Sequence, residues 1–225
     1  MTLPLSRPRA VLFDWDGTLV DSGACVEAAH NHVRRAFGMN DFTPEEFMHA
    51  ARIGTGRETF TVLYPTRVNE ALDLYYGVVP ALRATHVGPI PGALDFIEYL
   101  YRAGIPLGVV SNMRHDPLVE EIARMNWSHY FQTVIGAGEA ARGKPSPEPV
   151  YLAAERMGMT RADLENVWFV GDMETDEKAA KSARCPFLYY TGGISDARER
   201  SRMQASVKFD DYRKILHDVA PFLVM

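Results

Sequence analysis

Two aspartates two residues apart, Asp14 and Asp16, follow an apolar stretch at positions 10–13 that is typical of a buried strand. Two carboxylates this close repel each other when both are ionised, so a cation or hydrogen-bond donors must compensate them. A divalent metal ion is the simplest compensator. If the backbone stays extended through Asp16, both side chains lie on one side of it, and one can attack while the other transfers a proton. The Asp-Gly pair that ends this stretch is also common in ordinary turns, so the segment alone fits a site or a turn.

Other reactive groups also follow apolar stretches. Ser111 and Asn112 follow one such stretch, Lys144 lies in the loop after a second, and Asp172 follows a third. Ligands of parallel α/β sheets bind beyond the carboxyl ends of the strands, so these groups are expected to meet at one edge. Acids, a hydroxyl, an amide and a lysine gathered there fit a metal-assisted phosphate site. A strand end for Ser111-Asn112 and an exposed loop lysine remain the ordinary alternatives.

The elements that must position these groups fall into two regions. The pattern of residues 23–86 predicts only helices. They are expected at 24–37, from Pro44 onwards, at 60–64 and at 68–82, and Pro65 and Pro80 are expected to mark helix ends or a kink. From residue 87, strands and helices alternate. The expected strands are 107–110, 133–135, 167–170, 187–190 and 207–209, and the expected helices are 93–101, 116–125, 147–157, 176–183 and 212–219.

This alternation predicts an α/β fold with a Rossmann-like, doubly wound parallel sheet that has helices on both faces. The strand at 10–13 belongs to that sheet but is separated from the other strands by the helical stretch. We therefore expect a core domain of residues 1–22 and 87–225 with an inserted all-helical domain of residues 23–86.

The composition limits the class of protein. The 225 residues carry a net charge of −5, which argues against nonspecific nucleic-acid binding because that needs a basic surface. The two cysteines do not make a disulfide framework. No apolar run reaches membrane-spanning length, and Met1–Arg9 lacks the apolar centre of a signal peptide, so a cytoplasmic location is expected. The sequence leaves the oligomeric state open.

Four motifs occur in a fixed order over nearly the whole chain: Asp14-Trp15-Asp16-Gly17-Thr18, Ser111-Asn112, Lys144-Pro145 and Gly171-Asp172-Met173-Glu174-Thr175-Asp176. With these motifs the chain resembles the haloacid dehalogenase-like superfamily of hydrolases. Within it, the chain looks most like the phosphatases that carry a helical cap after the first motif, the phosphoglycolate phosphatase-like group.

The resemblance implies a role for each acid. Asp14 would be the nucleophile that forms an aspartyl-phosphate, and Asp16 would protonate the leaving oxygen and then activate water. The Asp14 carboxylate, the Asp16 backbone carbonyl and the Asp172 carboxylate would bind Mg²⁺. Asp176 would orient Lys144 or support the metal through water.

The resemblance also implies phosphate and substrate contacts. Ser111 and Lys144 would hold the phosphoryl oxygens, while Gly17 and Thr18 would shape the loop beside the phosphate. Thr18 and Asn112 are accordingly expected at the substrate. In the helical insert, Arg57 is expected to meet a substrate carboxylate, with Arg52 as the other candidate. A surface arginine on a loop is the alternative for both.

The residues together with the resemblance predict a Mg²⁺-dependent phosphomonoester hydrolase for a small phosphorylated metabolite, and the resemblance implies phosphoglycolate as the leading substrate. Asp16 favours a phosphate ester over a haloacid, because an alkoxide leaving group needs a proton and a halide does not. The insert has no lysine, which argues against the phosphonate-cleaving branch with its Schiff-base lysine. Two alternatives remain open: a sugar phosphomutase on the same scaffold, and a non-catalytic regulatory protein that keeps the fold.

Overall fold

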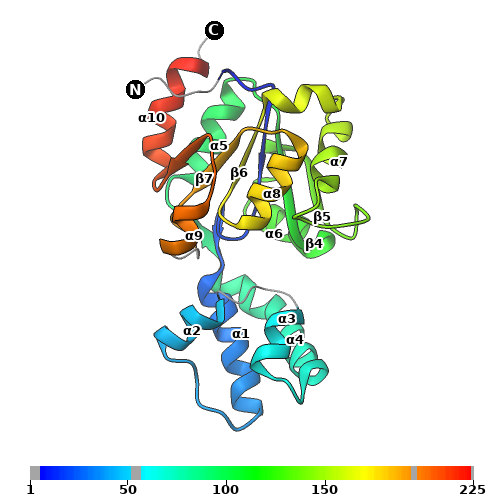
Figure 1. The fold of residues 1–225 in the computed structure, drawn as a ribbon, viewed down its shortest axis with the longest axis vertical. Helices are drawn as coiled ribbons and strands as arrows, with labels where there is room; N and C mark the ends of the chain where they lie inside the picture. Colours follow the sequence, from blue (N-terminus) through cyan, green and yellow to red (C-terminus); the bar gives the residue numbers. More distant parts are fainter. Residues whose placement is uncertain (1–5, 52–56, 194–196, 224–225) are drawn as a thin grey trace. The chain divides into compact units, whose positions relative to one another are not determined.

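The computed structural model describes residues 6–51, 57–193 and 197–223 (Figure 1). The chain divides into two compact units. Met1–Val20 and Pro89–Met225 form the first, which we call the sheet unit, and Asp21–Gly88 form the second, which we call the helical unit. The expected Arg52 contact lies outside the described residues.

The sheet unit is built on a six-stranded sheet whose neighbouring strands are all parallel. Its strands are β1 (Ala10–Phe13), β4 (Leu107–Arg114), β5 (Phe131–Ala137), β6 (Val167–Gly171), β7 (Phe187–Tyr190) and β8 (Val207–Phe209). They lie in the order β5-β4-β1-β6-β7-β8. The chain thus builds outward from β1 on one side and then from β6 on the other, so the order reverses between β1 and β6. This is the point where doubly wound sheets bind their ligands.

Helices cover both faces of this sheet. They are α5 (Ala93–Arg102), α6 (His115–Arg124), α7 (Glu148–Arg156), α8 (Glu174–Ala183), α9 (Ala197–Arg202) and α10 (Tyr212–Leu223), with 3₁₀ turns at Ser128–Tyr130 and Arg161–Asn166. Successive residues of β1 point to opposite faces. Leu12 joins a cluster with residues of α7 and α8, whereas Phe13 meets the ring of Phe96 in α5. Strands buried on both faces read as continuous apolar runs, which explains why the sequence pattern located them.

The helical unit contains α1 (Gly23–Ala36), α2 (Pro44–Ala51), α3 (Arg57–Leu63) and α4 (Val68–His86). Thr43 and Glu46 form the capping box that begins α2, with their side chains bonded to each other's backbone amides at 3.2 and 2.8 Å. α1 and α4 pack together, and an aromatic cluster around the buried His30 fills the space between the helices. Pro80 does not end α4, which continues to His86.

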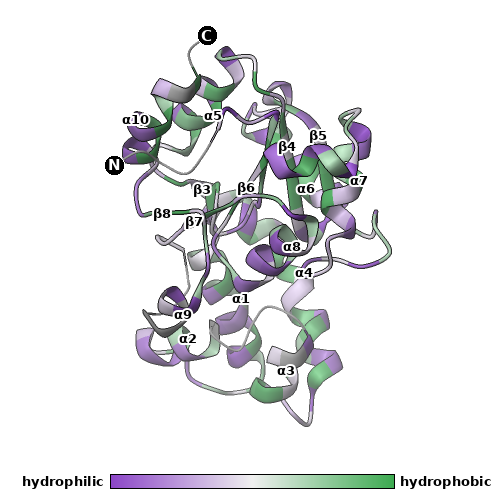
Figure 2. Ribbon diagram, turned by 45° about the horizontal axis from the view of Figure 1, so that its top comes forward, coloured by the Kyte–Doolittle hydropathy of each residue, from purple (hydrophilic) through white to green (hydrophobic). Residues whose placement is uncertain are grey.

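The doubly wound parallel sheet with a helical insert is confirmed, and the differences are local. β4 is longer than expected and runs to Arg114, which pairs with Ala137 of β5 after a register shift. Short strands β2 (Val20–Asp21) and β3 (Gly88–Pro89) form a separate two-stranded sheet that the apolar pattern did not indicate. The hydropathy colouring shows helices that carry hydrophilic as well as hydrophobic residues (Figure 2). Among the described residues, no helix combines the length and the apolar character that crossing a membrane would take.

Candidate active site

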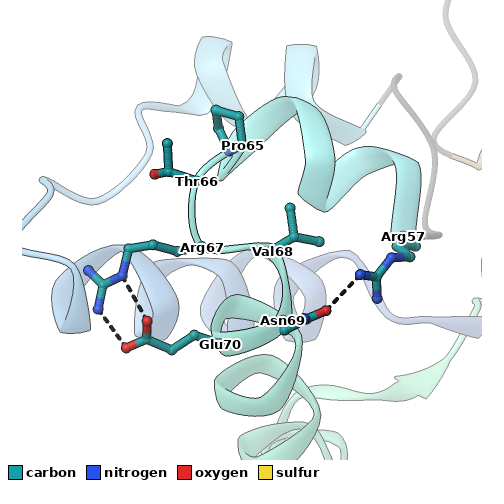
Figure 3. Close-up of a pocket in the computed structure, with 7 residues that line it drawn as sticks. All are labelled: Arg57, Pro65, Thr66, Arg67, Val68, Asn69 and Glu70. Atoms are coloured by element: carbon teal, nitrogen blue, oxygen red, sulfur yellow. Dashed lines mark hydrogen bonds and ion pairs between the residues drawn. The ribbon is translucent and has the colours of Figure 1, made fainter.

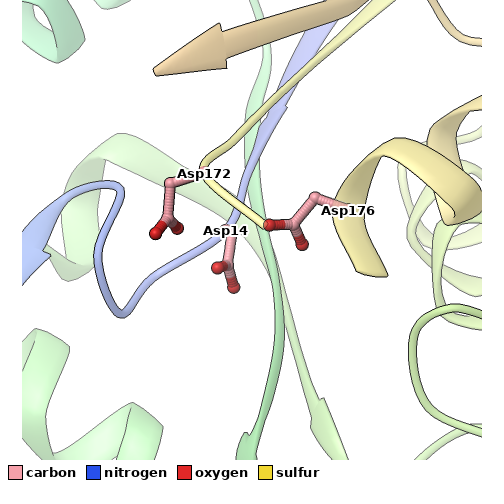
Figure 4. Close-up of side chains that lie close together, drawn as sticks. All are labelled: Asp14, Asp172 and Asp176. Atoms are coloured by element: carbon pink, nitrogen blue, oxygen red, sulfur yellow. The ribbon is translucent and has the colours of Figure 1, made fainter. Parts of the chain in front are cut away.

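Three buried aspartates gather where the strand order reverses (Figure 4). Asp14 follows β1, Asp172 follows β6 and Asp176 lies in the first turn of α8. Each offers a carboxylate oxygen, and these atoms all lie within 4.8 Å of one another. The Asp14 amide donates to the Val170 carbonyl at 2.9 Å, which ties the end of β1 to β6. The sheet therefore brings together acids that are far apart in the sequence.

Lys144 lies between two of these acids. Its ammonium Nζ is 2.5 Å from Asp14 Oδ1 and 2.7 Å from Asp176 Oδ1, and all three side chains are buried. An exposed loop lysine is thus ruled out. Asp176 contacts Lys144 directly, which is one of the two roles that the resemblance implied for it.

Asn112 holds the backbone of Lys144 from the end of β4. Its side-chain amide donates to the Lys144 carbonyl, and its carbonyl accepts the Lys144 amide, both at 2.9 Å. A Cβ at Gly143 would lie 2.6 Å from Asn112 Oδ1, so glycine permits this close approach. We expected Asn112 at the substrate, and the structure shows its side chain engaged with the lysine loop.

The carboxylate of Asp172 is enclosed by neighbouring backbone. The Thr18 hydroxyl donates to Asp172 Oδ1 at 2.9 Å, so this side chain, expected at the substrate, contacts an acid. A Cβ on Gly17 would lie 2.4 Å from Asp172 Oδ2, and one on Gly193 would lie 2.3 Å from it. Gly17 also has a φ of +78°, a conformation that favours glycine. Gly193 is a site-shaping residue that sequence reasoning missed, although the Gly192-Gly193 pair after a predicted strand was a usable signal.

The remaining predicted residues are described by their own contacts. Asp16 is half-buried and is bridged through its backbone to Val20. Ser111 is buried, and its hydroxyl accepts the Met113 amide at 3.1 Å. Arg57 is an exposed residue of the helical unit and donates to Asn69 Oδ1 at 2.6 Å, on the wall of a small pocket (Figure 3).

Burial and crowding disfavour ionisation of the acids. Burial, together with repulsion from Asp176, raises the pKa of Asp14 to about 7 against the opposing effect of Lys144. Burial and the charges of Asp14 and Asp176 also raise the pKa of Asp172 well above its usual range. Burial alone would lower the pKa of Lys144, but the two facing carboxylates outweigh it and raise that pKa.

This charge set fits a divalent cation. Three buried carboxylates face one ammonium group, so full ionisation leaves an excess of negative charge that the described side chains of the cluster do not balance. The donors are all carboxylate oxygens, the ligand type that hard cations such as Mg²⁺ prefer. All three carboxylates are candidates to hold such an ion, and Asp14 and Asp176 would do so while contacting the lysine at 2.5 and 2.7 Å.

Comparisons with known proteins agree with this geometry. Residues 11–190 match the family model described as haloacid dehalogenase-like hydrolase. A phosphoglycolate phosphatase of Salmonella paratyphi A is 29% identical over 241 residues, covering 94% of this chain and 92% of the relative. Two solved structures share the fold. One is a haloacid dehalogenase-like family hydrolase of Streptococcus pneumoniae with a TM-score of 0.81 at 18% identity, covering 95% of this chain and 97% of that one.

The second is a HAD-superfamily hydrolase, subfamily IA, of Geobacter sulfurreducens. It has a TM-score of 0.74 at 22% identity and covers 96% of this chain and 99% of the other. The family model spans most of the chain and includes the segments that supply Asp14, Lys144 and Asp172. The chain therefore belongs to the haloacid dehalogenase-like hydrolases.

Proposed function

We propose that this protein is a Mg²⁺-dependent phosphomonoester hydrolase that works through an aspartyl-phosphate on Asp14. The observation that carries the proposal is the buried contact of Lys144 Nζ with Asp14 Oδ1 at 2.5 Å, beside Asp172. A carboxylate that attacks an anionic phosphate must overcome charge repulsion, and a fixed ammonium group beside it lowers that barrier. Asp176, buried and 2.7 Å from the same ammonium, keeps the lysine in place.

Two aspartates share the covalent chemistry. An Asp14 oxygen attacks phosphorus while the bond to the leaving oxygen breaks, and Asp16 gives that oxygen a proton. In the second step Asp16 takes a proton from water, the water oxygen attacks the phosphorus of the acyl phosphate, and the Asp14 carboxylate leaves. Asp16 is half-buried rather than enclosed, which suits a group that exchanges protons with a leaving group and with water.

The Asp14 and Asp172 carboxylates and the Asp16 backbone carbonyl would hold Mg²⁺. When bound, the ion would neutralise charge on the carboxylates and the phosphoryl oxygens. Ser111 and Lys144 would bind phosphoryl oxygens, and Asn112 keeps the Lys144 backbone in register for this through its two 2.9 Å bonds.

The substrate class is a small phosphorylated metabolite in the cytoplasm, and phosphoglycolate is the first compound to test. The Salmonella relative carries that substrate in its name and aligns over 94% of this chain. A net charge of −5 disfavours a nucleic-acid substrate.

The test is phosphate release from p-nitrophenyl phosphate and from a panel of phosphorylated metabolites, with Mg²⁺ and with EDTA. Activity is expected only with Mg²⁺, and Asp14→Asn is expected to abolish it. The matched control is Asp95→Asn, the same change at an exposed position of α5, which should keep wild-type activity. Asp14→Asn activity within about tenfold of wild type would contradict the nucleophile assignment. Conversion of a hexose 1-phosphate to its 6-phosphate without net phosphate release would instead identify a mutase.

A further inference from the structure

A buried hydrogen bond links the first motif to a helix that the chemistry described so far does not use. The indole Nε1–H of Trp15, between the two site acids, donates to Glu121 Oε1 in α6 at 2.8 Å. Trp15 is fully buried and Glu121 is 3% exposed. The other Glu121 oxygen lies 3.3 Å from Nη2 of Arg124, and the Trp127 ring packs edge-on against Trp15 at 5.7 Å.

Trp15 is also the centre of the loop that carries Asp16. Its backbone amide favours the ionised form of Asp14 and so opposes the rise in the pKa of that acid. Its carbonyl accepts the amides of Leu19 and Val20 at 2.9 and 3.1 Å. An interaction that anchors the Trp15 side chain therefore acts on the backbone segment that carries both acids.

Packing alone does not require a carboxylate at position 121. An apolar side chain would fill the same buried volume without the cost of desolvating a charge. An indole has one donor in one direction, so an acceptor fixed in α6 selects one orientation of the ring. α6 begins at His115, directly after β4 with Ser111 and Asn112, so a single helix joins two segments of the site.

We propose that Trp15 and Glu121 are positioning residues, whose hydrogen bond holds the Asp14–Thr18 segment in the geometry needed for attack and proton transfer. The inference rests on the proposed phosphatase function. A small displacement of a reacting group costs much more in rate than in binding, because only the transition state demands the alignment.

The test compares Trp15→Phe, Glu121→Leu, the double variant and Glu121→Gln on p-nitrophenyl phosphate with Mg²⁺. The first two are expected to lower kcat roughly tenfold to hundredfold with KM within about threefold, and the double variant should lose no more than either one. Glu121→Gln keeps an acceptor for the indole and is expected to restore kcat to within about threefold of wild type. Trp168→Phe, the same change at a buried position of β6, is the control and should leave kcat unchanged.

A second readout does not depend on activity. Amide hydrogen exchange in residues 14–20 is expected to accelerate in Trp15→Phe and Glu121→Leu and to stay at the wild-type rate in Glu121→Gln. Lower stability of the first two variants with unchanged kcat and unchanged local exchange would show a purely structural bond and overturn the inference. An inactive wild type with the expected exchange pattern would overturn the phosphatase proposal but would still support the positioning role of the Trp15–Glu121 hydrogen bond. Equal amide exchange rates in residues 14–20 of all variants would overturn the positioning role of the Trp15–Glu121 hydrogen bond.

Discussion

Replacing Asp14 with asparagine is expected to stabilise the metal-free protein while removing its activity. The carboxylate is buried beside Asp172 and Asp176, and burial together with the Asp176 charge raises its pKa to about 7 from an ordinary value of 3.8. An acid whose pKa is higher in the folded than in the unfolded state binds more protons when folded. The free energy of unfolding therefore falls as the pH rises from about 4 to about 7, and asparagine removes this loss.

The size of the effect follows from the shift. A rise from 3.8 to about 7 corresponds to about 4 kcal/mol of unfolding free energy once Asp14 is fully ionised. The variant also loses the contact with Lys144, which keeps its partner Asp176 at 2.7 Å, so part of this gain is offset. We expect a net stabilisation of about 1–3 kcal/mol at pH 8 and almost none at pH 4.

Tryptophan fluorescence during urea unfolding reports on the sheet unit alone. The three tryptophans, Trp15, Trp127 and Trp168, all lie in the sheet unit, so unfolding of the helical unit does not enter the signal. The measurement is made in EDTA at pH 4, 6 and 8, with Asp95→Asn as the control for loss of a carboxylate at an exposed position. Added Mg²⁺ should stabilise the wild type more than the variant, because the variant lacks one ligand. An Asp14→Asn midpoint at or below the wild-type midpoint at pH 8 in EDTA would refute the argument from charge crowding.

Three further variants test separate contacts. Asn112→Ala removes both hydrogen bonds to the Lys144 backbone and is expected to lower kcat about tenfold or more, measured by phosphate release, with little change in far-UV circular dichroism. Gly193→Ala places a Cβ 2.3 Å from Asp172 Oδ2 and should raise the Mg²⁺ concentration needed for half-maximal activity about tenfold or more; calorimetric Mg²⁺ titration checks this independently. Burial holds the pKa of His30 at about 4 rather than 6.5, so the helical unit should lose stability as the pH falls through this window. His30→Phe should remove about 3 kcal/mol of that loss, read from amide exchange in α1.

The sequence predicted the parts of the site that depend on strand ends. β1 and β6 are uninterrupted apolar runs, and the first polar residues after them, Asp14 and Asp172, mark the edge of the sheet where ligands bind. Asp14 and Lys144 are 130 residues apart, yet each follows a strand, so parallel topology alone predicts their approach. The end of β4 was predicted too early, because the strand runs on through Ser111 and Asn112 to Arg114.

The contacts between side chains were beyond the sequence pattern. Nothing in the residue types shows whether Asn112 faces a substrate or the Lys144 backbone, because an amide suits both. The same holds for Glu121. A glutamate in a helix is usually exposed, but this one is buried against Trp15. Gly193 matters because it has no side chain. Only the structure shows this, since a Cβ added at Gly193 would lie 2.3 Å from Asp172 Oδ2.

The backbone around the acids explains why their repulsion persists in the fold. Asp172 cannot turn away, because the backbones of Gly17 and Gly193 leave no space even for a methyl group beside its carboxylate. Asp14 is held at its backbone by the 2.9 Å bond to the Val170 carbonyl and, through Trp15, by Glu121. A flexible site would separate its like charges and restore the ordinary pKa of each acid. A rigid one relieves the remaining repulsion by taking up a proton or a cation, so the interactions that fix the geometry also favour the binding of a cation, as the proposed Mg²⁺ site requires.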